Sequence, residues 1–343
     1  MTPTGETVLA FRLSNESGAS VEILTYGGIV RSLCVPALAG SAADVVLGFD
    51  QLEPYLKGHP YFGAIVGRIA GRVSGGRLLA GGRPWSVACN DPPNHLHGGK
   101  RGFDKRVWIP EVLHRDDGAP SLRLRHFSPD GEEGYPGNLE VAVTYTLAAD
   151  NSLIFETEAS ADQETPLSLA QHSYFNLAGE GSGGVQGHEV RIFAGDFVPT
   201  DDAMTLLDRR ERVWGTSADL KRQRPLGEVL PQLARSHGDL YLLRAPEEQP
   251  PVLPTLAATV FEPRSGRILV VSTTETCLQF YTGSGLDGTL VGKAGRPYGR
   301  HAGLCLECEG YPNATTVPGF GDILVRPGTP QRRTTVYQFP RPA

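Results

Sequence analysis

The chain has 343 residues, of which 40% are hydrophobic and 20% charged, and its formal net charge is -6. This composition is typical of a globular protein, and the acidic balance argues against a nucleic-acid-binding surface, which needs clustered lysine and arginine. Five cysteines are an odd and sparse set that does not suit a disulfide framework, and no stretch approaches the roughly 18 apolar residues of a membrane span. Because the N-terminal segment also lacks the regions of a signal peptide, we expect a cytoplasmic protein with no membrane or nucleic-acid partner.

The predicted elements, taken in chain order, are short strands separated by turns. We expect strands over 121–127, 139–147, 188–197, 267–275 and 277–283, each bounded by glycine, proline or aspartate. In 139–147, apolar residues alternate with smaller or polar ones, as they do in a strand with one buried face. The helices that a parallel α/β fold needs between its strands are missing from the pattern. The sequence therefore predicts an all-β fold, either a sandwich or a barrel.

The longest predicted loop is 231–256, which ends in the proline-rich run APEEQPPVLPTL. Proline cannot donate to a sheet, so this run does not suit a central strand. Strand patterning resumes at residue 257 with an unchanged composition. We therefore interpret the loop as an excursion within one domain that covers residues 1–343.

Two histidines lie two apart in NHLHGG (94–99), at His95 and His97. If this segment is a strand, both rings are on one face, a spacing that can hold a metal ion. The segment offers no third ligand nearby, because the next carboxylate is Asp104. The alternative is a strand end before a glycine turn, with one histidine merely hydrogen-bonded.

Three further polar residues stand out in apolar or glycine-rich surroundings. His172 lies in SLAQHSYFNLAG (168–179), which is consistent with a cleft or with an ordinary buried histidine. Arg72 follows Arg68 by four residues in VGRIAGRVSGG (66–76), where an arginine either is solvated or points into a pocket. Gln279 in CLQFYTG (277–283) either binds hydroxyl groups, as donor and acceptor, or faces water.

Two glutamates, Glu307 and Glu309, lie two apart in LECEGYPNA (306–314). In a regular strand they would share a face about 6.6 Å apart along the chain, and each would raise the proton affinity of the other. Alternatively, Gly310 and the Tyr311-Pro312 pair begin a turn that directs Glu309 into solvent. We favour the second interpretation. The nearby C-x-x-C of Cys305 and Cys308 lacks the second pair of a zinc site.

Taken together, these segments resemble the aldose 1-epimerase (mutarotase) family, of the galactose mutarotase type. The resemblance covers nearly the whole chain. It implies a large antiparallel β-sandwich, called a supersandwich, with a sugar site in a groove over one sheet and no metal or cofactor. The motifs that carry it follow the order of the family: DVVLGFDQLEPYL, YFGAIVGRIAGRV, NHLHGG with GFDKRVW, HSYFNLAG, LQFYTG, GLCLE…PNA and TVYQF.

The resemblance also implies roles for individual residues. Glu307 corresponds to the general base and His172 to the general acid of a reaction that interconverts the anomers of a free aldose such as galactose or glucose. An ionised carboxylate and an imidazolium suit that reaction near neutral pH. We expect a monosaccharide as the partner and a monomer or homodimer as the assembly. The positions that correspond to sugar-binding residues are Arg72, His97, Gln279 and, in place of the aspartate of an Asp-His-x-Phe motif, Asp239.

The chain departs from the family's pattern at several positions near the groove. Gly71 replaces an asparagine, Leu240 follows Asp239 in place of a histidine, and the motif LExQxxPDA has Glu309 and Asn313 in place of its glutamine and aspartate. The segment 198–210 also lacks the family's Ile-Pro-Thr-Gly. The predicted acid and base are retained, so these departures leave open which sugar fits.

Three other functions compete with this prediction. An inverting glycoside hydrolase uses two carboxylates about 6.5–9.5 Å apart, but they must flank the scissile bond rather than share a strand. A non-catalytic sugar-binding protein would not need both His172 and Glu307. An epimerase of phosphorylated hexoses would surround the phosphate with arginines, for which the candidates are Arg68, Arg72, Arg101 and Arg106.

Overall fold

The computed structural model describes residues 1–37, 41–233, 238–244 and 250–340. Its regular structure is nearly all β, as predicted, and the strand pairings are antiparallel. Among the described residues, no helix is long and apolar enough to span a membrane. The helices are short: α1 (Leu52–Lys57), α2 (Leu226–Leu233) and the 3-10 turns η1 (Ser74–Gly76), η2 (Phe103–Lys105), η3 (Glu132–Gly134), η4 (Val185–Gly187) and η5 (Lys293–Gly295).

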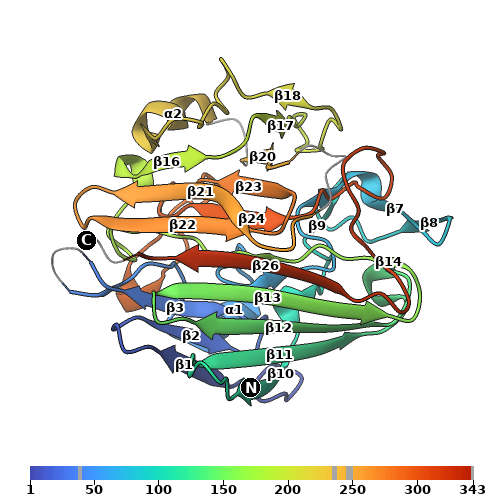
Figure 1. Cartoon of the computed structure of the whole chain (residues 1–343), viewed down its shortest axis with the longest axis horizontal. Coiled ribbons are helices and arrows are strands. Elements are labelled where there is room, and N and C mark those ends of the chain that lie inside the picture. Colours follow the sequence, from blue (N-terminus) through green and yellow to red (C-terminus); the bar gives the residue numbers. More distant parts are fainter. Residues whose placement is uncertain (38–40, 234–237, 245–249, 341–343) are drawn as a thin grey trace.

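The largest sheet has nine strands in the order β10-β11-β12-β13-β26-β22-β21-β16-β19. Figure 1 shows its long strands side by side, with the C-terminal strand β26 between β13 and β22. The sheet contains the predicted strands 121–127, 139–147 and 267–275, and β12 coincides with the range 139–147. The predicted strand 188–197 is divided between β16 of this sheet and β17 of the five-stranded sheet, which also contains the predicted strand 277–283 as β23. Its strands are β10 (Ile109–Leu113), β11 (Ser121–Ser128), β12 (Leu139–Leu147), β13 (Ser152–Ala161), β16 (Glu189–Ile192), β19 (Arg224–Pro225), β21 (Thr255–Glu262), β22 (Arg267–Thr273) and β26 (Gln331–Gln338).

Two smaller sheets and four two-stranded ladders complete the β-structure of the described residues. The four-stranded sheet contains β1 (Ala10–Ser14), β2 (Ser20–Leu24), β3 (Val30–Val35) and β4 (Ala43–Asp44). The five-stranded sheet, in the order β18-β17-β20-β23-β24, contains β17 (Asp196–Val198), β18 (Glu211–Arg212), β20 (Asp239–Leu242), β23 (Cys277–Tyr281) and β24 (Cys305–Glu309). The ladders pair β5 (Ile65–Val66) with β15 (Ala170–Gln171), β6 (Arg72–Val73) with β9 (His95–Leu96), β7 (Arg77–Ala80) with β8 (Arg83–Ser86), and β14 (Thr165–Pro166) with β25 (Leu324–Val325).

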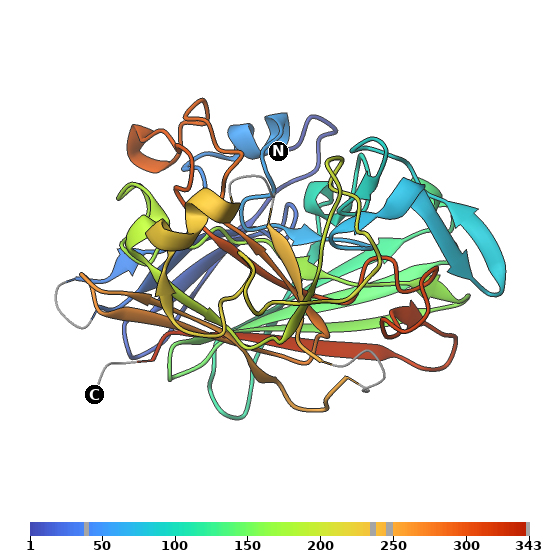
Figure 2. The ribbon, with the colours of Figure 1, turned by 90° about the horizontal axis from the view of Figure 1, so that it is seen from above.

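One apolar core joins the nine-stranded sheet to both smaller sheets. It contains Leu124 and Tyr145 of the large sheet, Ile23 of the four-stranded sheet, and Leu278 and Phe280 of the five-stranded sheet. Burial of such side chains is the main favourable term in folding. Viewed from above, both α-helices lie on the side of the molecule away from β26 (Figure 2). The predicted antiparallel β-sandwich is confirmed.

The predicted loop 231–256 is wrong in part, because it contains strand β20. This strand is an interior member of the five-stranded sheet, paired with β17 on one side and with β23 on the other. The prolines that argued against a strand come after β20 and before β21. Residues 234–237 and 245–249 of the predicted loop lie outside the described residues.

Arg68 is a structural residue rather than a solvated or pocket-lining one. Its side chain is 1% exposed and donates six hydrogen bonds, which reach residues on both sides of η3 and Thr165 of β14. Four of the acceptors are backbone carbonyl oxygens. The guanidinium therefore holds together loops that have no regular pairing of their own.

We expect Arg68→Met to lower the melting temperature by about 5 °C or more, because four backbone carbonyl groups lose a charged donor. Thermal unfolding followed by circular dichroism measures this. The control is Arg222→Met, since that side chain is exposed. Equal melting temperatures for the two variants would contradict the structural role.

Candidate active site

The five-stranded sheet has one face in the core and the other face on a pocket. Leu278, Phe280 and Cys308 point into the core. Because side chains alternate along a strand, Gln279 and Glu307 point the opposite way, and they are direct cross-strand partners. Both line a pocket of about 170 Å³, which is of a size for a small molecule.

The predicted acid, His172, is held over this face by backbone and ring contacts. Its N–H donates to Ala64 O at 2.9 Å, and its carbonyl oxygen accepts from Gly63 N at 3.0 Å. The imidazole stacks on Tyr174 and Tyr61, with ring centroids 5.2 and 5.7 Å away. The ring is therefore fixed in direction as well as in position.

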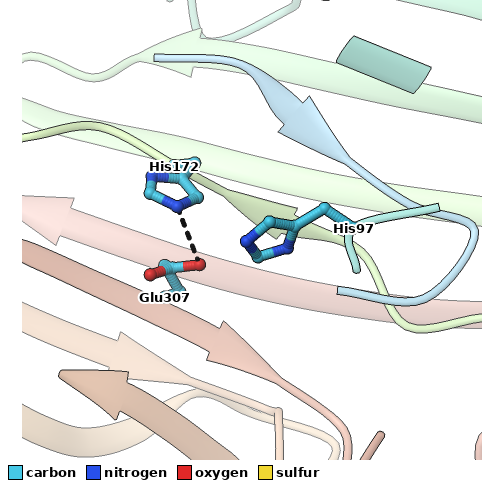
Figure 3. Close-up of side chains that lie close together, drawn as sticks. All are labelled: His97, His172 and Glu307. Carbon is cyan, nitrogen blue, oxygen red and sulfur yellow. Dashed lines mark ion pairs between the residues drawn. The ribbon is translucent and has the colours of Figure 1, made fainter. Parts of the chain in front are cut away.

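His172 and Glu307 face each other across 3.3 Å, from Nε2 to Oε2 (Figure 3). Both are almost completely buried. Burial lowers the pKa of His172 to about 4 and raises the pKa of Glu307 to about 8, although Arg72 opposes the rise. These two shifts favour a neutral carboxyl group and a neutral imidazole over the expected carboxylate–imidazolium pair, and both forms hold the same single proton.

His97 presents a hydrogen-bond donor to the pocket. The Gly71 N–H donates to His97 Nδ1 at 3.1 Å, so a neutral His97 carries its proton on Nε2. Burial, followed by the charge of a protonated His172, lowers its pKa well below the ordinary value and keeps it neutral. Its ring packs edge-on against His172, with centroids 5.2 Å apart.

Arg72 lines the pocket and is positioned by a residue that the sequence did not single out. Its Nε donates to Asp91 Oδ2 at 2.7 Å, and both residues lie beside the short ladder of β6 with β9. The remaining guanidinium nitrogens are available to a ligand on the pocket side. No spacing in the sequence connects Asp91 to Arg72, because η1 and the hairpin of β7 and β8 lie between them.

Asp239 is the one predicted site residue that the structure does not bring to the pocket. Its cross-strand partner is Phe280, which points into the core, whereas Leu240 pairs with Gln279 on the pocket face. Burial raises the pKa of Asp239 to about 6. The preceding residue, Gly238, does line the pocket.

The expectation that Glu309 turns into solvent is wrong. It belongs to β24, is fully buried and lines the pocket with Glu307. The strand stays regular through residue 309, with Glu309 paired to Cys277, and the turn begins only afterwards. The structure thus places two carboxyl groups on the same face of one strand.

The histidine pair His95 and His97 does not form the metal site considered above. His95 Nδ1 lies 2.7 Å from Ala88 O and its Nε2 lies 2.6 Å from the Tyr135 hydroxyl, so both its nitrogens are engaged away from the pocket. A different set, His97, His172 and Glu307, has ligand atoms within 4.8 Å of one another and could coordinate a divalent transition metal. The resemblance described above implies a reaction that does not use one.

Several pocket residues carry no signal in the sequence. Tyr61, Tyr174 and Tyr281 line the pocket as aromatic walls, and Met204 and Leu206 enclose it from the segment that follows β17. An aromatic residue in a strand is as consistent with the core as with a binding site. A core aromatic residue and a pocket aromatic residue are distinguished only by the face of the sheet on which the side chain lies, and only the fold shows that face.

The comparisons with known proteins identify the family of the chain. The chain matches the aldose 1-epimerase family over residues 10–338. It belongs to the aldose 1-epimerase family. It is 43% identical to galactose mutarotase of Sus scrofa over 98% of this chain and 96% of that one, and 42% identical to galactose mutarotase of Homo sapiens over 98% and 95%. Aldose 1-epimerase of Escherichia coli K12 is 31% identical over 99% of this chain and 97% of its own.

Solved structures of the family have the same fold. The GalM/aldose epimerase homologue of C. elegans superposes with a TM-score of 0.88 at 26% identity, over 98% of this chain and 100% of that one. Galactose 1-epimerase of Lactobacillus acidophilus NCFM superposes with a TM-score of 0.84 at 25% identity, over 100% and 97%. The chain is thus an enzyme, an isomerase with aldose 1-epimerase activity, and its substrate is a monosaccharide.

The buried carboxyl groups of the site predict a pH-dependent cost in stability. Burial first, then Glu307 and Glu275, raise the pKa of Glu309 well above its ordinary value. In the unfolded chain this group ionises near its ordinary pKa, so rising pH favours unfolding until the folded-state pKa is reached. We expect Glu309→Gln to raise the melting temperature by about 2 °C or more at pH 7.5, and by less at pH 5.

Thermal unfolding at the two pH values tests this expectation. The control is Glu158→Gln, since Glu158 is half exposed and pairs with Arg332 of the neighbouring strand in the nine-stranded sheet. A gain for Glu309→Gln that is the same at both pH values would contradict the electrostatic origin, because only ionisation depends on pH.

Proposed function

We propose that this enzyme interconverts the α and β anomers of galactose-like and glucose-like free aldoses, with Glu307 as general base and His172 as general acid. The observation that carries the proposal is the 3.3 Å contact between His172 Nε2 and Glu307 Oε2 inside the pocket. The choice of sugar is supported by the names of the mammalian relatives, which are galactose mutarotases.

The chemistry needs one proton that two groups exchange with the sugar. Glu307 takes the proton of the C1 hydroxyl while His172 gives a proton to the ring oxygen, and the ring opens to the aldehyde. Rotation about the C1–C2 bond then exposes the other face of the carbonyl group, and the two residues reverse their roles to close the ring. A proton shift from Glu307 to His172 converts the neutral resting pair into the carboxylate and imidazolium that begin this cycle. Each positioned group is worth about 10²–10⁴ in rate.

The other polar residues of the pocket suit the binding of an uncharged sugar. His97 offers its Nε2–H, Gln279 offers an amide as donor and acceptor, and Arg72 offers guanidinium N–H groups beyond its bond to Asp91. The Arg72 charge also opposes the rise in the Glu307 pKa, which helps the base to ionise.

The pocket charges argue against a phosphorylated substrate. Of the four arginines considered, Arg72 alone lines the described pocket, whereas Arg68 is engaged with backbone carbonyls and Arg106 pairs with Glu132 at 2.6 Å. The same pocket holds two carboxyl groups, which do not provide the cationic surroundings that a phosphate needs. Glu307 and Glu309 also share a strand face, an arrangement that does not flank a scissile glycosidic bond.

We expect Glu307→Gln and His172→Asn each to lower kcat by about 10²–10⁴, because each removes one proton-transfer group and keeps the side-chain shape. Polarimetry on freshly dissolved α-D-galactose and α-D-glucose, corrected for the buffer rate, measures the effect. Glu158→Gln is the matched control and should match the parent enzyme. Near-normal turnover by Glu307→Gln would refute its role as the base.

The pH profile of kcat/KM follows from the shared proton. The productive pair holds one proton, so activity falls as pH rises through the pKa of about 8 at Glu307, when that proton is lost. It also falls as pH drops through the pKa of about 4 at His172, when a second proton binds. We expect a broad plateau between these values in initial rates corrected for the buffer reaction. An acid limb centred near the ordinary histidine pKa of about 6.5 would contradict the neutral resting pair.

A further inference from the structure

Glu309 is a buried carboxyl group that the proposed reaction does not use. It is 0% exposed, it lines the pocket, and neither of its oxygens has a hydrogen-bond partner within the described parts of the chain. Buried polar atoms in proteins are nearly always hydrogen-bonded, since leaving them unpaired is costly. An unpaired carboxyl group that faces a pocket indicates that a ligand supplies its partner.

The local backbone makes room for this carboxyl group. Gly71 has a φ of +74°, and a Cβ atom built on it would lie 2.7 Å from Glu309 Oε1 and 2.7 Å from Pro312 Cγ. Any other residue at position 71 would therefore displace the Glu309 side chain. The same glycine donates its N–H to His97 Nδ1, so one residue both orients His97 and accommodates Glu309.

The position of Glu309 along β24 sets which part of a sugar it can reach. It follows Glu307 by two residues on the same strand face, a displacement of about 6.6 Å along the strand. A sugar whose C1 end contacts Glu307 and His172 extends away from them across the pocket floor. The Glu309 end of the pocket, near Gly71 and Pro312, is then within reach of the more distant ring substituents.

The charge of the site favours a hydroxyl group as the partner of Glu309. The only guanidinium that lines the described pocket, Arg72, is already paired with Asp91. Glu309 itself has no hydrogen-bond partner within the described residues, and a carboxyl oxygen accepts a hydrogen bond from a hydroxyl group, which a sugar supplies.

We propose that Glu309 is a specificity-determining residue of this enzyme, whose carboxyl group binds one ring hydroxyl of the aldose at a carbon other than C1, in space that Gly71 leaves open. The inference rests on the proposed function, since it takes the C1 end of the sugar to lie at Glu307 and His172. It adds a sugar contact to those that the resemblance implied, at a position where this chain departs from the family's pattern.

The test is a double-mutant-type cycle, in which one change is made in the enzyme and the other is the removal of one hydroxyl group from the sugar. We would measure kcat/KM of the parent enzyme and of Glu309→Ala on D-galactose and on its 2-, 3-, 4- and 6-deoxy analogues. For one analogue, the parent enzyme should lose about tenfold or more relative to galactose, and Glu309→Ala should lose less than about threefold, because the partner of that hydroxyl is already absent. The other analogues should be penalised equally in both enzymes. Glu309→Gln, which keeps a donor and an acceptor, should restore most of the discrimination.

Gly71→Ala is a second, independent variant, because its Cβ displaces the carboxyl group without changing it. It should lose discrimination against the same analogue as Glu309→Ala does, with folding checked by circular dichroism. If galactose is turned over but no analogue shows a different penalty in Glu309→Ala, this inference is overturned and the proposed function stands. If neither galactose nor glucose is turned over, the proposed function fails. The binding affinities of the same sugars for the parent enzyme and for Glu309→Ala are then measured by calorimetry. If each deoxy sugar loses the same affinity in both enzymes, the inference is overturned.

Discussion

Side-chain alternation along β24 is the constraint on which the active site depends. The strand lies between the core and the pocket, so Leu306 and Cys308 pack into the core while Glu307 and Glu309 line the pocket. A shift of one residue in its pairing with β23 would exchange these faces and bury both carboxyl groups in the core. The apolar contacts of Leu306 and Cys308 with the core therefore fix the catalytic register. They do so without touching the substrate.

The same arrangement explains why burial of the two carboxyl groups costs the folded protein free energy. Glu307 and Glu309 are desolvated next to one another, and the nearest cation, Arg72, is shared with Asp91. The pKa of each carboxyl group is raised, which favours the neutral form and so reduces the repulsion between them. Such a site contributes little to folding and depends on the surrounding sandwich for its stability. Under the proposal made above, the hydroxyl groups of a bound sugar supply the hydrogen-bond partners that the protein does not.

Much of the fold could be predicted from the sequence, because alternation with period two is a local signal. The range 139–147 became β12 residue for residue, and the motifs around Glu307 and His172 correctly pointed to residues that meet in space. The errors arose where a local pattern is ambiguous. The turn residues after Glu309 suggested an early exit from the sheet, but the pairing of Glu309 with Cys277 keeps the strand regular to its last residue.

Other features of the site depend on contacts between distant segments and were beyond the reach of the sequence. Asp239 was predicted to bind the sugar because it is an acidic residue in a segment similar to the family's motif. Side chains alternate along β20, however, and Asp239 pairs with Phe280, which points into the core. The bond from Arg72 to Asp91 and the fit of Glu309 against Gly71 join residues that no spacing rule connects. The protonation of Glu307 could not be inferred either, since its cause is burial.

The most direct test of this account is a crystal structure of the Glu307→Gln variant with bound D-galactose. The account predicts that the C1 hydroxyl and the ring oxygen lie within hydrogen-bond distance of residue 307 and His172, and that a different ring hydroxyl lies on Glu309. A sugar that binds with C1 away from residue 307 and His172 would contradict the assignment of the acid and the base. A correctly placed C1 with no sugar oxygen near Glu309 would confine the contradiction to the second carboxyl group.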